Sequence, residues 1–118
     1  MQNRFHRLNP PENGVPPEQV RFLELRPEPW PDGRRVRIHV QITPFLQPPH
    51  MSMSIADPDG REVSHVEVVE NVDFKLVFTM HIRSEQVSGQ YDLVAQLFYD
   101  DLGEVDRQTV SFETEEKQ

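Results

Sequence analysis

The longest regular pattern in the chain runs from Gly89 to Tyr99, where apolar residues alternate with mostly polar ones. Side chains spaced by two residues share one face of an extended strand, whereas on a helix they would spread around the circumference. One face would hold Tyr91, Leu93, Ala95, Leu97 and Tyr99, and the other Asp92, Val94, Gln96, Phe98 and Asp100. The pattern predicts a central β-strand with one face in the core.

Six further segments have the length and composition of strands: residues 20–26, 35–43, 50–56, 61–69, 73–83 and 104–113. Apolar residues change parity between Phe22 and Leu23, and a β-bulge would reconcile them. The mixed parity of 61–69 predicts an irregular edge strand. The most apolar inward face belongs to 73–83, with Phe74, Leu76, Phe78, Met80 and Ile82.

Proline and glycine mark the connections between these segments. Pro27, Pro29 and Pro31 predict that ladder pairing stops after the first strand, because proline has no N–H to donate. The run Asp57-Pro58-Asp59-Gly60 predicts a tight turn with positive φ at its glycine, joining the third and fourth strands. The pattern as a whole predicts an all-β, seven-stranded antiparallel β-sandwich. We expect the first, second and fifth strands in one sheet, and the fourth, third, sixth and seventh in the other.

The start of the central strand, Gly89-x-Tyr91-x-Leu93, resembles the entry to the sixth strand of immunoglobulin-like domains. In those domains a tyrosine stands two residues before a buried position that antibodies fill with cysteine. The resemblance implies that Tyr91 is a structural corner, with its ring packed inward and its hydroxyl bonded to backbone a few residues upstream. The expected sheet order resembles the fibronectin type III arrangement of this architecture.

A chain of 118 residues fits a single domain. Residues 1–18 are proline-rich and are predicted to be a flexible N-terminal arm, which Phe5 and Leu8 could pin to the domain. The immunoglobulin-like sandwich is expected at 19–113, and a polar tail at 114–118. The lack of cysteine excludes disulfides and thiolate metal sites. The first 15 residues contain no apolar run of signal-peptide length, so a cytoplasmic protein is the expectation.

The formal net charge of −8 is unevenly distributed along the chain. Residues 1–59 carry seven basic and seven acidic side chains, whereas residues 60–118 carry five and thirteen. An acidic surface repels phosphates, which argues against binding to nucleic acid or to an anionic membrane.

Histidines suggest a site on the second and fifth strands. His39 and His81 are expected to face outward and to lie opposite each other, but two imidazoles without a third ligand hold a metal weakly. Arg37, Lys75 and Arg83 would repel a cation there, so no metal or other cofactor is expected. A locally basic patch that attracts an acidic protein surface, or a second copy, is the better hypothesis.

The remaining candidates for chemistry are weak. Asp100, Asp101, Glu104 and Asp106 cluster in one hairpin, where alternation would place Glu104 and Asp106 on the same face, and a solvated turn is favoured over a calcium site. Ser64 and His65 are adjacent in the sequence, but in an extended strand their side chains would point to opposite faces. No nucleophile elbow, phosphate-binding glycine loop or zinc motif is present, so the chain is expected not to be an enzyme.

Two binding surfaces remain. The outer face of the central sheet would show Val94 and Phe98 in a modest apolar strip suited to a partner protein or a homodimer. Trp30 either caps the core, which is favoured, or acts with Phe45 as a stacking residue for sugar. The first hypothesis is a soluble, non-enzymatic protein-interaction module. The alternatives are a module that binds carbohydrate or another small ligand and, third, a hydrolase with an unrecognised site.

Overall fold

A computed structural model describes residues 13–83 and 88–114 of the chain. A short 3-10 helix, η2 (Pro17–Gln19), precedes seven strands. The strands are β1 (Phe22–Pro29), β2 (Arg35–Ile42), β3 (His50–Ala56), β4 (Glu62–Val68), β5 (Lys75–His81), β6 (Gly89–Tyr99) and β7 (Gly103–Thr114).

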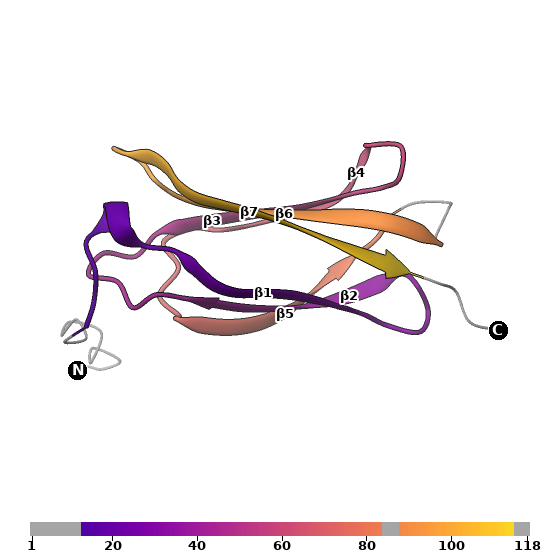
Figure 1. The fold of residues 1–118 in the computed structure, drawn as a ribbon, viewed down its shortest axis with the longest axis horizontal. Coiled ribbons are helices and arrows are strands. Elements are labelled where there is room, and N and C mark those ends of the chain that lie inside the picture. The colour runs from indigo at the N-terminus through magenta and orange to yellow at the C-terminus, as the bar shows by residue number, and fades with distance from the viewer. Residues whose placement is uncertain (1–12, 84–87, 115–118) are drawn as a thin grey trace.

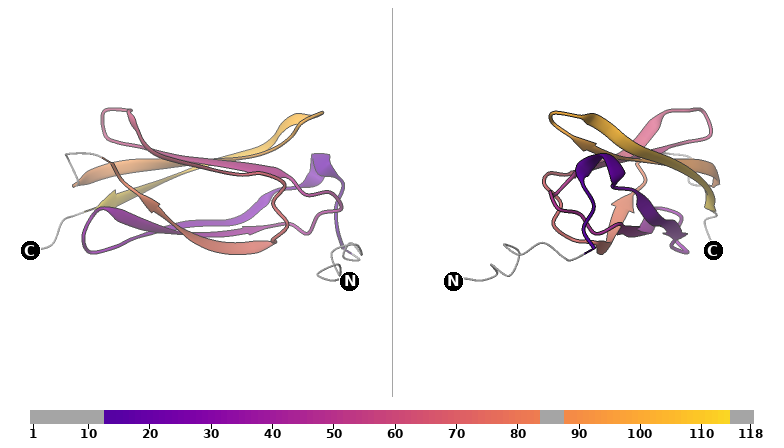
Figure 2. Two further views of the ribbon diagram at one scale, coloured as in Figure 1. Left: turned by 180° about the vertical axis from the view of Figure 1, so that it is seen from behind. Right: turned by 60° about the vertical axis from the view of Figure 1, so that its left-hand side comes forward.

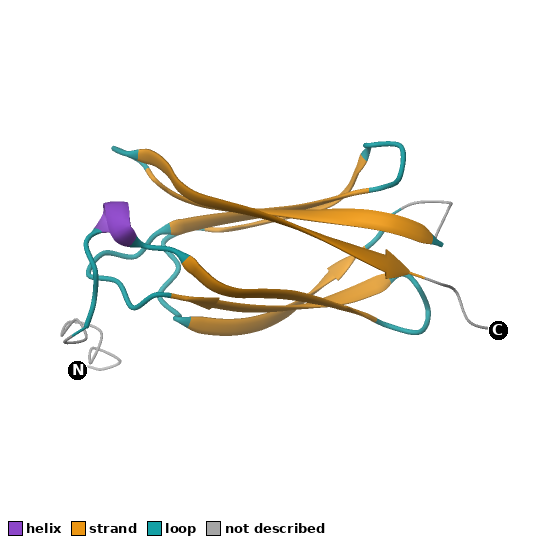
Figure 3. Cartoon of the chain, in the orientation of Figure 1, coloured by secondary structure: helices purple, strands orange, loops and turns teal. Residues whose placement is uncertain are grey.

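The strands form two antiparallel sheets stacked as layers (Figure 1). One sheet has the order β1-β2-β5 and the other β4-β3-β6-β7. The predicted sandwich and its division between the sheets are therefore confirmed. Strands make up more than half of the described chain, and most of the loops lie at the two ends of the layers (Figure 3).

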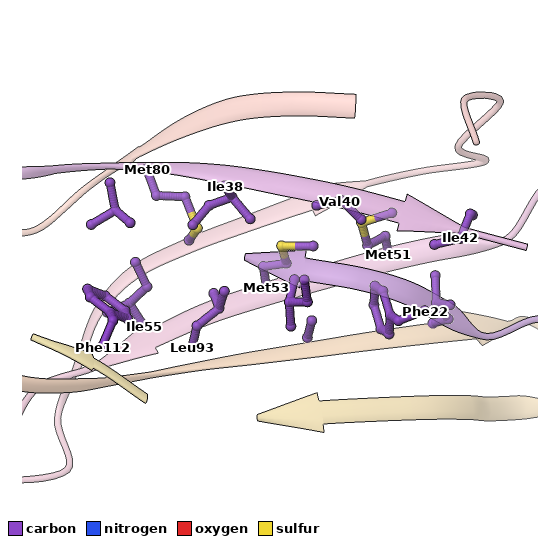
Figure 4. Packing of buried hydrophobic residues seen from close by; sticks show 14 of the residues in the cluster. Phe22, Ile38, Val40, Ile42, Met51, Met53, Ile55, Met80, Leu93 and Phe112 are labelled. Atoms are coloured by element: carbon purple, nitrogen blue, oxygen red, sulfur yellow. The ribbon is translucent and has the colours of Figure 1, made fainter. Parts of the chain in front are cut away.

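A single core fills the space between the layers, because every strand alternates one apolar face inward (Figure 4). Residues from the central strands β2, β3 and β6 are the most completely buried, and Ile38, Met53 and Leu93 lie in one cluster. Each fully buried side chain of this size contributes roughly 1.5–3 kcal/mol to the free energy of unfolding.

The first strand contains the predicted bulge, and its prolines behave differently from the prediction. The register of β1 shifts between Phe22 and Glu24, so Phe22 and Leu25 are both buried while Leu23 is exposed. The strand then continues through Pro27 and Pro29 and stays paired with β2, so the predicted stop was wrong. The N–H of Trp30 bonds the carbonyl of Arg35 at 2.8 Å, so along this antiparallel ladder the prolines' nitrogens point away from β2. Because the two prolines lack an N–H only on the side away from β2, no hydrogen bond of the β1–β2 ladder is lost.

The hairpin between β3 and β4 follows the sequence prediction. The Gly60 N–H bonds the Asp57 carbonyl at 2.9 Å, and Gly60 has a φ of 86°. A register shift between Ile55 and Ala56 brings Val63 inward beside Val66, which confirms an irregular edge strand.

Tyr91 is fully buried at the start of β6, and its ring stacks on Phe112 with 5.9 Å between the ring centroids. The inward packing implied by the resemblance is confirmed. Residues 84–87, which stand a few positions upstream, lie outside the described residues, so the bond expected for the hydroxyl stays a prediction.

The described part of the predicted arm contacts the sandwich. Val15 forms a parallel bridge with Phe45, whose ring meets Phe74 edge-on at 4.8 Å. Phe45 is thereby buried, so the interpretation of Phe45 as a sugar-stacking residue was wrong. Residues 1–12, with Phe5 and Leu8, and residues 115–118 lie outside the described residues.

Candidate functional site

The free edge of β5 presents a row of backbone groups. In the β2–β5 ladder, the Ile82 N–H bonds the Arg34 carbonyl and the Ile42 N–H bonds the Phe74 carbonyl, at 2.7 and 2.8 Å. Even-numbered residues of β5 therefore point their N–H and C=O groups at β2, and the odd-numbered residues point theirs away. The outward groups belong to Lys75, Val77, Thr79 and His81, all exposed. Within the described residues, no strand pairs with this edge.

The inner face of β5 is only partly covered. Phe74, Leu76 and Phe78 point inward as predicted, yet all three are half-buried. Across from them, Val66 and Val68 on β4 are half-buried as well. These two strands form one side of the sandwich, which faces the viewer when the molecule is turned round (Figure 2, left). The core is therefore less completely closed along this side than at its centre.

A cleft of about 450 Å³ separates β4 from β5. It is lined by backbone and side chains of both strands, including His65, Met80 and His81. Where β5 ends, the Arg83 N–H donates to the Val63 carbonyl at 3.0 Å and ties the two sheets together. The cleft thus lies between the edges of two sheets that are joined at one point.

The outer face of the three-stranded sheet carries the predicted cations together with acidic residues from β1. Arg37 lies between Glu28 on β1 and Thr79 on β5, and Lys75 lies beside Gln41. Arg26 is paired with Glu24 at 3.3 Å. Basic character is therefore concentrated toward β5 and is weaker toward β1.

The predicted pairing of His39 with His81 was wrong. His39 lies opposite Val77, and His81 opposite Arg35, so four register positions, about 13 Å along the strand, separate the two residues. His39 instead contacts Glu28 at 2.9 Å, and this hydrogen bond lowers the pKa of the Glu28 carboxyl below its ordinary value. Among the residues described, no group of three potential ligands could hold a metal ion.

Trp30 lies outside the core, so the favoured interpretation of it as a core cap was wrong. It follows β1 with the same outward parity as Glu28, and its ring lies under the guanidinium groups of Arg35 and Arg37, at 4.2 and 5.4 Å from the ring centroid. The indole is half-buried by these contacts and by neighbouring prolines. No pattern of alternation could have shown this, because the residue stands in a turn.

The outer face of the four-stranded sheet has no continuous apolar strip. Val94 lies between Ser54 and Thr109, while Phe98 packs against the ring of His50 at 5.2 Å. Gln96 stands between Val94 and Phe98 on this face, with its amide on Glu104 at 2.7 Å. The two predicted contact residues are thus half-buried and separated by a polar residue.

The acidic residues near the β6–β7 hairpin point in different directions. A register shift between Leu97 and Phe98 places Glu104 on the outer face, where Arg107 and Gln96 bond it and lower its pKa. Asp106 turns toward the other sheet and accepts the Phe22 N–H at 2.8 Å. The prediction that Glu104 and Asp106 share a face was wrong, because a single-residue bulge reverses the alternation.

Sequence analysis missed a row formed by Ser54, His65 and Glu67. The Ser54 hydroxyl lies 2.8 Å from His65 Nδ1, and His65 Nε2 lies 3.2 Å from Glu67. Ser54 and His65 are cross-strand neighbours, which only the register reveals. The distances suit a nucleophile with its base. Ser54 stands in the middle of β3, however, whose ladders to β4 and β6 occupy the backbone N–H groups that an oxyanion hole would need.

No protein-family model and no curated protein sequence matches the chain. Several solved structures with a similar fold are glycoside hydrolases. A β-glucuronidase of Bifidobacterium dentium aligns with a TM-score of 0.62 and 15% identity, over 80% of this chain and 18% of its own. For β-glucuronidase 3 of Bacteroides uniformis the TM-score is 0.59 and the identity 20%, over 80% of this chain and 12% of that one.

A glycosyl hydrolase family 2 member from Bacteroides cellulosilyticus aligns with a TM-score of 0.58 and 18% identity, over 80% of this chain and 14% of that one. The chain resembles one β-sandwich domain within these enzymes. It spans less than a fifth of their length, and the likeness at this identity is one of fold. No helix in the described ranges is long and apolar enough to cross a membrane.

Proposed function

We propose that this domain is a non-catalytic protein-interaction module that receives an extended, acidic segment of a partner protein along β5. The open edge of β5 carries this proposal. A strand edge with unpaired N–H and C=O groups is a template for a further strand, and natural proteins normally block such edges with proline, bulges or covering segments. Over its seven residues β5 has no proline and no register shift.

An added strand would also cover apolar surface. It would lie beside Leu76 and Phe78, which the two sheets leave half-buried, and beside Val77, whose exposed fraction is 51%. Main-chain bonds would supply affinity, and alternate side chains of the incoming strand would supply specificity.

The charges near β5 favour an acidic partner over a second copy. Lys75 and His81 lie at the two ends of the edge, and Arg37 is next to it on β2. Antiparallel pairing of two β5 strands about their centre would place Lys75 of one copy beside His81 of the other, a pairing that offers Lys75 no opposite charge. Glutamate or aspartate on the incoming strand would instead meet opposite charge.

The comparison with known structures supports a module that works by contact. In the glycoside hydrolases the similar region is a minor part of a much longer chain. The row of Ser54, His65 and Glu67 supports hydrolysis less well, since its serine has no free backbone donors around it.

A pair of designed peptides tests the proposal. An eight-residue peptide alternating glutamate and valine should shift the amide resonances of residues 75–81, and a lysine–valine peptide should bind about tenfold more weakly at low salt. Thr79→Pro removes an N–H that points to the open edge and should weaken binding of the acidic peptide about tenfold.

Thr79→Val is the matched control, because it keeps the backbone donor and the side-chain shape, and it should bind as the wild type does. Lys75→Glu gives a second, charge-based test that leaves the ladder intact. The proposal fails if the peptide leaves β5 unperturbed or if Thr79→Pro binds unchanged while remaining folded. Sedimentation that shows a dimer lost in Thr79→Pro would identify a second copy as the occupant and contradict the acidic partner.

A further inference from the structure

The loop at residues 69–74, which joins β4 in one sheet to β5 in the other, is attached to the first residue of β3. The Glu70 N–H donates to Nδ1 of His50 at 3.0 Å. On the other side of the same ring, Nε2 lies 3.2 Å from a carboxylate oxygen of Asp100, which follows β6. The His50 side chain packs on Phe98 and is only 14% exposed, so it is held between the loop and the sheet.

The contact with Glu70 determines which nitrogen of the neutral His50 ring carries the hydrogen. A backbone N–H is always a donor, so Nδ1 must accept, and the single hydrogen of the neutral imidazole is on Nε2. Nε2 is the nitrogen beside Asp100, whose carboxylate is an acceptor. Each nitrogen of the neutral ring therefore faces a group that suits it.

Protonation of His50 changes one of these contacts and keeps the other. The added hydrogen goes to Nδ1, which becomes a second donor pointed at the Glu70 N–H, so that hydrogen bond is lost. Nε2 keeps its hydrogen and forms an ion pair with Asp100. The ring thus exchanges a bond to the loop for a charged contact with the hairpin that follows β6.

The charged side chains around the ring come from every element that packs against it. A cavity of about 310 Å³ beside His50 is lined by three carboxylates: Glu67 on β4, Glu70 in the loop and Asp100 after β6. His65 contacts the first of these, at 3.2 Å. On β7, Glu104 stands opposite Phe98 and is bonded by Arg107. Among the residues that the structure describes, no lysine or arginine lines this cavity, so the protonated ring has only carboxylates to pair with.

Glu70 has a backbone conformation that depends on its contacts. Its φ of 49° is in the left-handed region, which side chains other than that of glycine rarely allow, and no other non-glycine residue of the described ranges has a positive φ. The next residue, Asn71, is buried, and its N–H bonds the Pro49 carbonyl at 2.7 Å. A carbonyl does not titrate, so Asn71 stays attached to β3. Loss of the His50 bond therefore releases Val69 and Glu70 alone.

We propose that His50 is a pH-sensitive switch for the β4–β5 loop, which it holds when the ring is neutral and releases when the ring gains a proton. A histidine side chain ordinarily changes its charge near about pH 6.5, inside the physiological range. Val69 and Glu70 form part of the cavity wall that Phe98 also lines, so their release widens this cavity. The switch needs no partner strand on β5.

A pH titration followed by NMR tests the switch in the wild-type chain. Between about pH 7.5 and about pH 5.5, the Glu70 amide resonance should shift with the same midpoint as the His50 ring. The hydrogen-exchange protection of this amide, corrected for the intrinsic rate, should fall about twofold to tenfold, the range for loss of one hydrogen bond. The Asn71 amide should keep its protection.

Three variants separate the acceptor from the charge. His50→Asn offers an amide oxygen in place of Nδ1 but cannot titrate, so Glu70 should stay protected at both pH values. Asp100→Asn keeps the Glu70 bond and removes a charge that stabilises the protonated ring, so release should need a lower pH. His65→Asn is the matched control, because it removes another histidine flanked by carboxylates and should leave the Glu70 transition unchanged.

The proposal fails if the Glu70 amide does not respond while the His50 ring titrates, if the response persists in His50→Asn, or if His65→Asn abolishes it. The wild-type titration decides the first of these without any substitution. Binding of the peptides to β5 is measured separately at a single pH, so failure of one proposal leaves the other testable.

Discussion

The strands β1 and β5 flank the same central strand, β2, but their free edges differ. On β1, Pro27 and Pro29 stand at positions whose nitrogens point outward, so two donors are missing from that edge. β7 of the other sheet lies alongside β1 (Figure 1). The Phe22 N–H is bonded to Asp106 on β7. On β5 the outward N–H groups all remain, and β4 diverges from it across a cleft.

This difference teaches that the apolarity of a strand does not tell whether its edge is open. The segment that forms β5 has the most apolar inward face in the sequence, yet Leu76 and Phe78 of β5 are half-buried. β1 has the irregular pattern, with a bulge and prolines, and is the protected one. Bulges and prolines prevent an edge strand from pairing with another chain, so the more regular strand is the better candidate for binding a partner strand.

The largest expected effect is a difference in the free energy of unfolding between variants at the centre of the core and variants at its open side. Ile38→Ala on β2 should lower the free energy of unfolding by about 2–5 kcal/mol, because a fully buried side chain leaves a cavity that the core cannot close. Leu76→Ala on β5 should cost less than about 2 kcal/mol, because that side chain is already half in solvent. Urea unfolding measures both. Equal losses would show that β5 is as enclosed as β2.

A smaller effect is expected at the closed edge. Asp106→Ala leaves the part-buried Phe22 N–H without its acceptor and should cost about 1–3 kcal/mol in the same measurement. Asp106→Asn retains an oxygen acceptor and should lose less. Asp101→Ala, in the exposed hairpin beyond β6, is the control and should change stability by less than about 0.5 kcal/mol. If Asp101→Ala and Asp106→Ala behave alike, the contact between β1 and β7 does not close the edge.

The smallest effect concerns the turn between β1 and β2. Hydrogen bonds from the Arg34 N–H, first, and from Arg35 hold the pKa of Asp32 below its ordinary value of 3.8. A lowered pKa stabilises the folded state at pH values above the ordinary one, and this contribution is lost as the pH falls through the folded-state value. Asp32→Asn should therefore be slightly less stable than the wild type near neutral pH, and this difference should shrink as the pH falls below the ordinary pKa of 3.8, as measured by thermal unfolding. A difference that persists in acid would contradict the assignment.

Much of the fold was predictable because its signals act over a few residues. The alternation of Tyr91, Leu93 and Leu97 set one face of β6 inward, and the turn at Asp57–Gly60 joined β3 to β4. The candidate sites were less predictable. Arg37, Lys75 and Trp30 were identified as surface or contact residues from their type, but the groups that face them come from other strands or across a turn.

Chain order and residue pattern were sufficient to specify two sheets of three and four strands, since hydrophobic period and turn chemistry are local properties. The tertiary structure alone established three features: the open edge of β5, the place of Trp30 outside the core, and the hydrogen bond from the Phe22 N–H to Asp106. Each depends on a register that one extra residue can shift, or on how far two sheets diverge, and neither quantity is encoded in the spacing of apolar residues along a single strand.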